Sequence, residues 1–137
     1  MNKLKSILIL WLPVLFWAWL IFFLSSIPNL KASQNPVLDE ILRKTAHFLE
    51  YLILYVLFFR ALNWQKTKKN FWLPFVLTFI YSFSDEFHQF FVPTRSARFR
   101  DVLIDGSGAF IGGLIVWKLL PKAQNKLKNW AKKLGVI

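Results

Sequence analysis

Long apolar runs alternate with short polar or basic stretches along the chain. The first run covers residues 7–24 without interruption, and at about 1.5 Å of rise per helical residue it nearly spans a hydrocarbon core of about 30 Å. Ser25-Ser26-Ile27-Pro28 follows and is typical of a helix stop and a turn. No small-x-small cleavage site comes after the run, so we expect it to be retained as a membrane span.

Three further apolar runs each carry polar residues at one end only. The second begins near Asp39 or Arg43, ends at Leu62 and has its polar residues in the first half. The third, residues 71–92, has them at its end, and the fourth, residues 101–120, has them at its start. Successive spans cross in opposite directions, so the three polar ends are expected at the same membrane boundary. The pattern predicts an all-α membrane protein, a bundle of four transmembrane helices.

The last part of the chain has a different pattern. Its apolar residues recur at helical spacing with lysines between them: Ala123, Leu127, Trp130, Ala131 and Leu134. This is the pattern of a basic amphipathic helix that lies on a membrane surface. We therefore divide the chain into a four-helix transmembrane domain, residues 1–120, and a basic membrane-surface tail, residues 121–137.

Composition supports the membrane class and removes several alternatives. The chain has 137 residues, of which 55% are hydrophobic and 18% aromatic, and it contains no cysteine. One domain is expected at this length, and disulfides, thiol nucleophiles and cysteine-ligated zinc are excluded. The formal charge of +11 does not indicate nucleic-acid binding, because the basic residues flank apolar runs instead of forming one polar face. We expect membrane lipid head groups as their partners.

The basic residues also predict an orientation. If the N-terminus is cytoplasmic, twelve basic residues lie on the inner side: Lys3, Lys5, Arg60, Lys66, Lys68, Lys69, Lys118, Lys122, Lys126, Lys128, Lys132 and Lys133. Six lie on the outer side: Lys31, Arg43, Lys44, Arg95, Arg98 and Arg100. Because basic residues are enriched on the cytoplasmic side, we expect both termini in the cytoplasm. The polar ends of the second, third and fourth helices would then form one pocket at the outer face.

Three short clusters hold both histidines and five of the seven acidic residues. The Lys44 cluster contains Lys44, His47, Glu50 and Tyr51; the Asp85 cluster contains Asp85, Glu86, His88 and Gln89; the Arg95 cluster contains Arg95, Arg98, Arg100, Asp101 and Asp105. A carboxylate near the bilayer centre costs at least about 2.5 kcal/mol, so such residues mark a functional site or its internal pairing. The clusters therefore predict where chemistry takes place.

The residue types in the clusters predict roles. Adjacent carboxylates at the end of an apolar helix repel each other, so we expect Asp85 and Glu86 to be acid/base or metal-binding groups. His88 and His47 would assist them, with a carboxylate beside His88 orienting its ring. Arg95 is predicted to contact a phosphate or carboxylate. The other predicted substrate contacts are Gln89, Lys44 and Tyr51, and the predicted supporting residues are Glu50, Asp101 and Asp105.

Alternatives stay open for several of these residues. A divalent metal is one, because histidine and carboxylates on facing helices form metal sites in bundles. Its candidate ligands on facing helices are His47, Glu50, Asp85, His88, Asp101 and Asp105. No complete metal motif is present, so no cofactor is assigned. The structural alternatives are an ion pair between Lys44 and Glu50, a hydrogen bond of His47 within the bundle, an N-cap role for Asp101, and lipid head-group contacts for Arg98 and Arg100.

Two glycines predict a close helix contact. Gly108 and Gly112 are four residues apart in the fourth helix, with Gly113 beside them. Small residues at this spacing permit close backbone approach between membrane helices. We expect them to press the face that carries Asp101 and Asp105 against a neighbouring helix.

At these same residues the chain resembles the VanZ-like family of small bacterial membrane proteins. The matching segments, in family order over roughly residues 15–115, are Phe22-Phe23-Leu24-Ser25-Ser26, Lys44-x-x-His47-Phe48-x-x-Tyr51, Ser84-Asp85-Glu86-Phe87-His88-Gln89-x-Phe91-Val92-Pro93-x-Arg95 and Asp101-Val102-x-x-Asp105-x-x-Gly108-x-x-x-Gly112. Thr94 stands where the family often has a glycine. The resemblance implies a multi-span helical protein. It also suggests a connection with glycopeptides, since the family's named member is linked to resistance to teicoplanin.

These observations lead to one main hypothesis and two alternatives. The main hypothesis is a membrane-embedded enzyme that modifies an envelope lipid or precursor, lipid-linked or phosphorylated, at the outer face. The first alternative is a non-catalytic binding or accessory protein that sequesters a glycopeptide or an envelope lipid. The second is proton-coupled transport, for which four spans are few. The sequence does not predict the oligomeric state.

Overall fold

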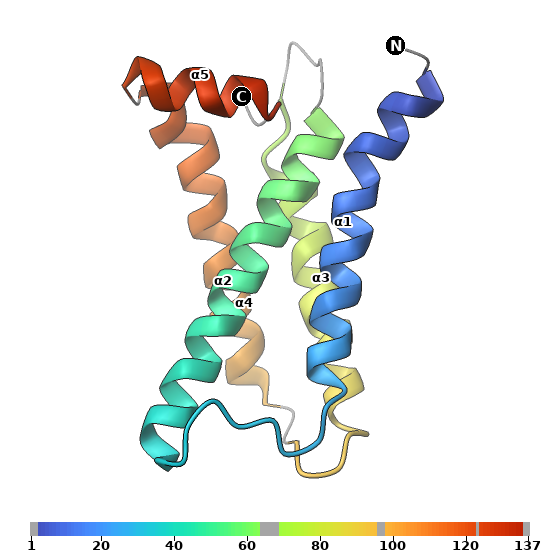
Figure 1. The fold of residues 1–137 in the computed structure, drawn as a ribbon, viewed down its shortest axis with the longest axis vertical. Helices are drawn as coiled ribbons and strands as arrows, with labels where there is room; N and C mark the ends of the chain where they lie inside the picture. The colour runs from blue at the N-terminus through green and yellow to red at the C-terminus, as the bar shows by residue number, and fades with distance from the viewer. Residues whose placement is uncertain (1–2, 64–68, 96–97, 123, 136–137) are drawn as a thin grey trace.

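The computed structural model describes residues 3–63, 69–95, 98–122 and 124–135, with side chains from residue 7 onward. Within these ranges the regular structure is entirely helical, as predicted (Figure 1). The five α-helices are α1 (Lys3–Ser25), α2 (Pro36–Asn63), α3 (Trp72–Gln89), α4 (Phe99–Leu114) and α5 (Asn125–Lys133). A π-helical segment, Ile115–Leu119, and a 3₁₀ turn, Leu120–Lys122, extend α4.

Three of the helical stretches are long and apolar enough to cross a membrane: Ile7–Ser25, Pro36–Asn63 and Phe99–Lys122. Among the described residues α3 does not qualify, because the polar residues of the Asp85 cluster fill its second half. Large apolar side chains face outward along α1, where Leu12, Leu15 and Phe16 are 59–64% exposed. An apolar exterior of this kind suits a lipid environment, and the chain has the character of a multi-pass membrane protein.

The helix boundaries differ from the predicted ones for local reasons. α1 ends at Ser25, where the sequence predicts a stop. α2 begins at Pro36, earlier than predicted, because Asn35 Oδ1 accepts hydrogen bonds from the N–H groups of Val37 and Leu38. Asparagine before a proline in the first helical position is a strong start signal. α4 begins at Phe99, two residues before the predicted start.

α2 and α4 make the closest helix contact in the bundle. A Cβ atom at Gly112 would lie 2.9 Å from the carbonyl oxygen of Leu52, and one at Gly108 would overlap the carbonyl group of Phe48. Only glycine permits this approach. Gly108 lies three residues after Asp105, so the contact holds the acidic side chains of α4 beside α2.

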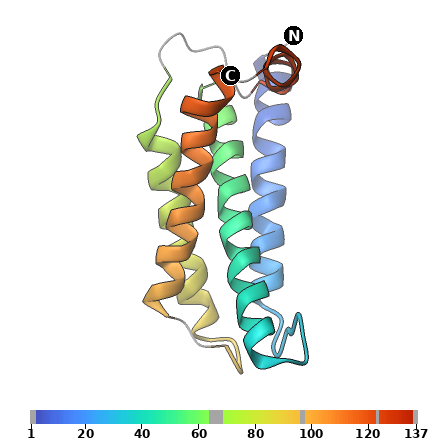
Figure 2. The same cartoon turned by 90° about the vertical axis from the view of Figure 1, so that its left-hand side faces the viewer.

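The two ends of the bundle are different. Helices α1 to α4 run alongside one another, and α5 lies across the end where α1 begins (Figures 1 and 2). The connections from α1 to α2 and from α3 to α4 lie at the opposite end (Figure 1). All three polar clusters belong to that opposite end. Of the predicted tail residues, Ala131 is buried and Trp130 is exposed, whereas Ala123 lies outside the described residues, as do Lys66 and Lys68.

Candidate functional site

Asp39 ties the α1–α2 loop to the first turn of α2. Its Oδ1 accepts hydrogen bonds from the N–H groups of Ala32 at 2.7 Å and Ser33 at 3.3 Å. Its Oδ2 accepts one from Arg43 Nε at 2.9 Å, one helical turn further on. The loop is thereby held against the N-terminal part of α2, where both contribute to the wall of a pocket.

Arg95 ties the α3–α4 connection to the end of α1. Its Nη2 donates to the carbonyl oxygens of Leu24 at 3.1 Å and Ile27 at 3.3 Å, and its Nε donates to Ile27 at 3.3 Å. A cation is favourable at a helix C-terminus, where carbonyl groups lack helical partners. Burial lowers the pKa of Arg95, but the guanidinium stays charged because its ordinary pKa lies far above neutral pH.

A second contact joins the same two loops. The N–H of Asn29 donates to Thr94 Oγ1 at 2.9 Å. Both residues have positive φ, 54° for Asn29 and 70° for Thr94. Asparagine tolerates this conformation, whereas a β-branched residue is strained in it. The backbone therefore favours glycine at position 94, and the hydroxyl of Thr94 compensates through its hydrogen bond.

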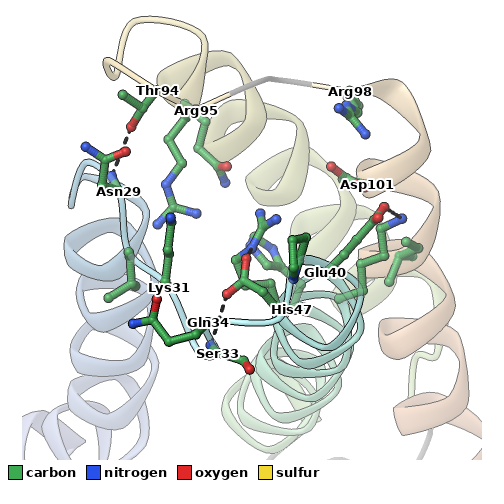
Figure 3. A pocket seen from close by; sticks show the side chains of 17 residues that line it. Asn29, Lys31, Ser33, Gln34, Glu40, His47, Thr94, Arg95, Arg98 and Asp101 are labelled. Atoms are coloured by element: carbon green, nitrogen blue, oxygen red, sulfur yellow. Dashed lines mark hydrogen bonds and ion pairs between the residues drawn. The ribbon is translucent and has the colours of Figure 1, made fainter.

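A pocket of about 330 Å³ lies between the two loops and the ends of α2, α3 and α4 (Figure 3). Five basic residues line it: Lys31, Arg43, Lys44, Arg95 and Arg98. Its three acidic residues are Asp39, Glu40 and Asp101. Two of these acids are paired, Asp39 with Arg43 and Glu40 with Lys44. Positive charge exceeds negative charge on the wall, so the pocket suits an anionic ligand.

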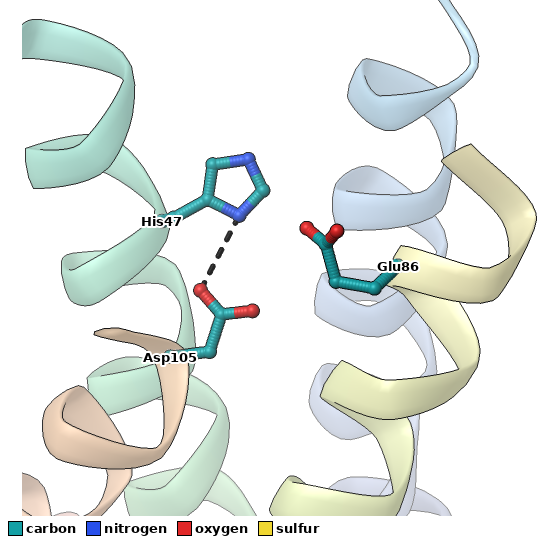
Figure 4. Close-up of side chains that lie close together, drawn as sticks. All are labelled: His47, Glu86 and Asp105. Atoms are coloured by element: carbon teal, nitrogen blue, oxygen red, sulfur yellow. Dashed lines mark ion pairs between the residues drawn. The ribbon is translucent and has the colours of Figure 1, made fainter. Parts of the chain in front are cut away.

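One side chain from each cluster meets beside this pocket. His47 of α2, Glu86 of α3 and Asp105 of α4 place their potential ligand atoms within 4.8 Å of one another (Figure 4). His47 Nδ1 lies 3.4 Å from Asp105 Oδ1. The side chain of Asp105 is 0% exposed, whereas that of His47 is 19% exposed and lines the pocket. We call these three residues the His47 centre.

Two neighbours orient the acids of the His47 centre. Ser82 Oγ donates to Asp105 Oδ2 at 2.7 Å. The backbone N–H of Arg98 donates to Glu86 Oε2 at 3.0 Å. Asp105 Oδ1 and His47 Nδ1 have no hydrogen-bond partner among the described residues, although both are buried. The centre therefore contains fixed carboxylates with unused acceptor capacity next to an imidazole, the residue set of acid/base or metal chemistry.

Asp85 lies in a second buried polar group, on the side of α1. Its Oδ2 accepts hydrogen bonds from Ser25 at 2.9 Å, Gln89 at 3.0 Å and Tyr51 at 3.2 Å. The donors come from α1, α2 and α3, so one carboxylate oxygen joins three helices. Tyr51 is 0% exposed and lies beneath the pocket wall instead of lining it.

Comparison with known families identifies the chain. The VanZ/LLP1 family model matches residues 10–121, from the second turn of α1 to the 3₁₀ turn after α4. The chain belongs to the VanZ/LLP1 family. The VanZ-like resemblance inferred from the motifs is thereby confirmed, and the match includes all three clusters. No curated protein and no solved structure matches the chain.

In this VanZ/LLP1 chain the histidine that faces a carboxylate is not the one that the sequence predicts. Within the described residues His88 Nε2 lies 3.0 Å from Ser26 Oγ, and its ring packs on Phe22 with centroids 4.3 Å apart. The histidine that faces a carboxylate is His47, opposite Asp105. Helical spacing shows which residues share a face, but not toward which neighbouring helix that face turns.

Two structural alternatives are also wrong. Lys44 pairs with Glu40 and not with Glu50, because an acid four residues earlier on α2 is within reach of its side chain. Asp101 is not the N-cap of α4, since that position belongs to Arg98. Asp101 lies in the first turn, where its negative charge interacts favourably with the helix dipole.

The remaining predicted residues divide between the pocket and other surroundings. Lys44, Gln89, Arg95, Arg98 and Asp101 line the pocket. Arg100 is exposed and not part of the wall. Glu50 is half-buried on α2, and its backbone oxygen accepts a hydrogen bond from Trp17 Nε1 at 2.9 Å.

The sequence predicts no site role for several residues of the VanZ/LLP1 pocket and of the His47 centre. In the pocket wall they are Asn29, Lys31, Asp39 and Glu40, and beside Asp105 it is Ser82. Asn35-Pro36 was a usable signal for Asp39 and Glu40, because it marks a helix start that places Asp39 in the first turn and Glu40 directly after it. Lys31 has no comparable signal, since its position depends on a loop that is held by side-chain contacts.

Proposed function

We propose that this VanZ/LLP1 protein is a membrane enzyme that modifies an anionic envelope lipid or precursor. The observation that carries the proposal is the His47 centre, where residues from three separate clusters come within 4.8 Å of one another. They adjoin a pocket whose wall is predominantly basic. A basic wall beside an imidazole and two carboxylates combines binding of a charged group with groups suited to chemistry.

The proposal includes the topology. In it α3 crosses the membrane as a fourth span, which is supported by its position alongside α2 and α4 (Figure 2). Both termini are cytoplasmic, which is supported by the predominance of Lys and Arg at that end of the chain. The pocket then opens at the outer face of the cell membrane. α5 lies on the inner surface, with Leu127, Trp130 and Leu134 in lipid.

The ligand in this proposal carries a phosphate or a carboxylate. Arg98 presents a guanidinium group, which binds such an anion with two parallel hydrogen bonds, whereas Arg95 adds its positive charge while its Nε and Nη2 hold the carbonyl oxygens of Leu24 and Ile27. Lys31 adds a third charge, and these three residues make no ion pair with an acid among the described residues. The acyl part of an envelope lipid would remain against the apolar exterior of the helices.

A pair of matched variants tests for catalysis. Glu86→Gln removes an acid of the His47 centre, and Glu40→Gln removes an acid of the pocket wall that has no place in the centre. Cells that express the wild type should accumulate a covalently changed lipid or wall precursor, detected by comparative mass spectrometry. Glu40→Gln should retain that species and Glu86→Gln should lose it at equal protein abundance.

The same experiment separates catalysis from binding. Binding without chemistry predicts that the protein protects or retains a ligand in proportion to its amount, and that no new species arises. That result would contradict the enzyme hypothesis and support the alternative of a non-catalytic accessory protein. The proposal also extends the family's named link to teicoplanin to this chain: wild-type expression should lower susceptibility to this glycopeptide, and Glu86→Gln should restore it.

A further inference from the structure

We infer that the His47 centre holds a divalent metal ion of the zinc class. It offers one imidazole nitrogen and two carboxylate oxygens from three different helices. The inference deepens the proposed function by naming the cofactor of the same centre. The role of the metal in this inference rests on the proposed function. The binding of the metal does not.

Two of the buried side-chain atoms that lack a hydrogen-bond partner within the described ranges belong to the His47 centre. Asp105 is fully buried, yet its Oδ1 has no hydrogen-bond partner among the described residues. The nearest polar group, His47 Nδ1 at 3.4 Å, is also buried and without such a partner. At 3.4 Å these two atoms form an ion pair without a hydrogen bond. Buried polar atoms without hydrogen bonds are costly, and a cation shared by both atoms would satisfy them together.

The buried charge of the centre also favours a divalent ion. Glu86 is only 5% exposed and Asp105 is 0% exposed, so two carboxylates are removed from water within one small space. Buried charges require a partner of opposite sign. A divalent ion neutralises two ionised carboxylates, whereas a protonated His47 alone would neutralise one.

The spacing of two ligand atoms in the centre fits a tetrahedral ion. Two ligand atoms that each lie about 2.1 Å from a tetrahedral ion are roughly 3.4 Å apart. His47 Nδ1 and Asp105 Oδ1 already have this spacing. Glu86 offers a carboxylate oxygen within 4.8 Å of the other two ligand atoms. Three protein ligands leave the fourth position of a zinc ion open, as in catalytic sites.

The surroundings of the ligands have the form of an outer shell. Ser82 Oγ donates to Asp105 Oδ2, and so leaves Oδ1 as the atom directed at the metal. The Arg98 N–H fixes Glu86 through Oε2 in the same way. Asp101, one turn before Asp105 on α4, has a buried Oδ1 without a partner in the described chain, and it is suited to accept a hydrogen bond from a metal-bound water. Such outer contacts orient ligands and tune the ion.

The ligand set favours zinc over magnesium or calcium. Imidazole is a ligand of zinc, iron, nickel and copper, whereas magnesium and calcium prefer oxygen ligands alone. Manganese accepts carboxylates and is the natural comparison. A zinc ion here would polarise a phosphoryl or carbonyl oxygen of a ligand held by the basic wall of the pocket.

The test is a metal titration of the purified full chain in detergent. The protein carries no histidine tag, is stripped with EDTA, and is titrated with Zn²⁺ or Mn²⁺ by calorimetry, with metal content measured in parallel. We expect one zinc ion per chain. His47→Gln, Glu86→Gln and Asp105→Asn should each weaken zinc binding at least about 100-fold, since even the loss of an outer-shell partner costs 10–100-fold.

Each of these variants has a matched control. His88→Gln, Glu40→Gln and Asp85→Asn remove the same chemical groups from other polar surroundings and should bind zinc like the wild type. Size-exclusion chromatography and circular dichroism show whether each variant is folded. The inference is overturned if the wild type binds neither metal, or if the three centre variants bind zinc as tightly as their controls.

A second measurement on the wild type does not depend on variants. Co²⁺ in place of zinc should give the intense visible absorption of a four-coordinate ion. A weak spectrum like that of aqueous Co²⁺ would overturn the inference. Product formation by metal-stripped protein would overturn the cofactor role inferred for the ion while leaving the proposed function intact. Stoichiometric zinc binding without any altered lipid or precursor would support the metal site and contradict the enzyme.

Discussion

Asp85 and Asp105 are both buried carboxylates of the same bundle, but their surroundings differ. One oxygen of Asp85 accepts hydrogen bonds from three neutral donors on three helices. Asp105 accepts one, from Ser82, and its other oxygen faces His47. Burial of an acid therefore does not by itself identify a reactive group. The neighbouring groups determine whether a buried acid is reactive. The neighbours of Asp105 include an ionisable histidine and a second carboxylate.

This comparison changes the emphasis of the sequence prediction. The adjacent carboxylates Asp85 and Glu86 are expected to act together, yet they point to different sides of α3. Asp85 faces the group that joins α1, α2 and α3, and Glu86 faces the His47 centre. We expect Asp85 to contribute mainly to stability and Asp105 mainly to chemistry.

The largest expected effect is on activity. Asp105→Asn keeps the shape of the side chain and an acceptor for Ser82, but removes the charge beside His47. Product formation, measured as the altered lipid or precursor per unit of protein, should fall about 1000-fold, within the range of acid/base and metal contributions. Product formation should fall far less in Asp85→Asn. Equal losses in the two variants would remove the distinction between the two acids.

The next effect is on stability. Asp85→Ala leaves the buried donors of Ser25, Tyr51 and Gln89 without their acceptor, and each unsatisfied group costs about 1–3 kcal/mol. The free energy of unfolding in detergent should fall by about 3 kcal/mol or more. A change below about 1 kcal/mol would show that the three-helix contact is dispensable.

The charged wall of the pocket should have a smaller effect. Arg98→Gln removes a guanidinium from the pocket, whereas Arg100→Gln removes one from an exposed position outside it. Binding of inorganic phosphate should weaken about tenfold in the first variant and remain unchanged in the second, and should decline with salt. If both variants weaken binding equally, the attraction comes from general positive charge and not from the pocket.

The smallest effect compares the two serines that donate to the acids. Ser82→Ala removes the donor to Asp105, and Ser25→Ala removes one of three donors to Asp85. Each substitution should cost about 1 kcal/mol. For Ser82→Ala we expect this cost as a loss of product formation of about fivefold. For Ser25→Ala we expect it as a decrease in the free energy of unfolding. The reverse assignment would contradict the roles given to the two acids.

Much of the fold follows from periodicity and apolar length. The four long helices, the stop at Ser25 and the common end of the three polar clusters are all predictable, because helix length and chain direction fix them. The pairing of side chains is not predictable in this way. Two acids come shortly before His88 in the sequence, yet His47 is the histidine that faces a carboxylate, because the rotation of α2 and α3 decides which side chains meet.

The pocket wall is the least predictable part. Its loop between α1 and α2 contains no apolar pattern, and its course depends on Asp39, whose contacts reach back to Ala32 and Ser33. The positive φ of Thr94 likewise cannot be predicted from the sequence, because threonine is an unusual residue for that conformation. Tertiary contacts, and not local preference, set both features.

The central claim is that His47 and Asp105 act as one unit, and a double-mutant cycle tests it most directly. His47→Gln, Asp105→Asn and the double variant are compared for product formation at equal abundance of folded protein. We predict that the double variant is no slower than the slower single variant, about 1000-fold below the wild type, because residues of one catalytic unit are non-additive. Losses that multiply in the double variant would show independent residues and would contradict the account.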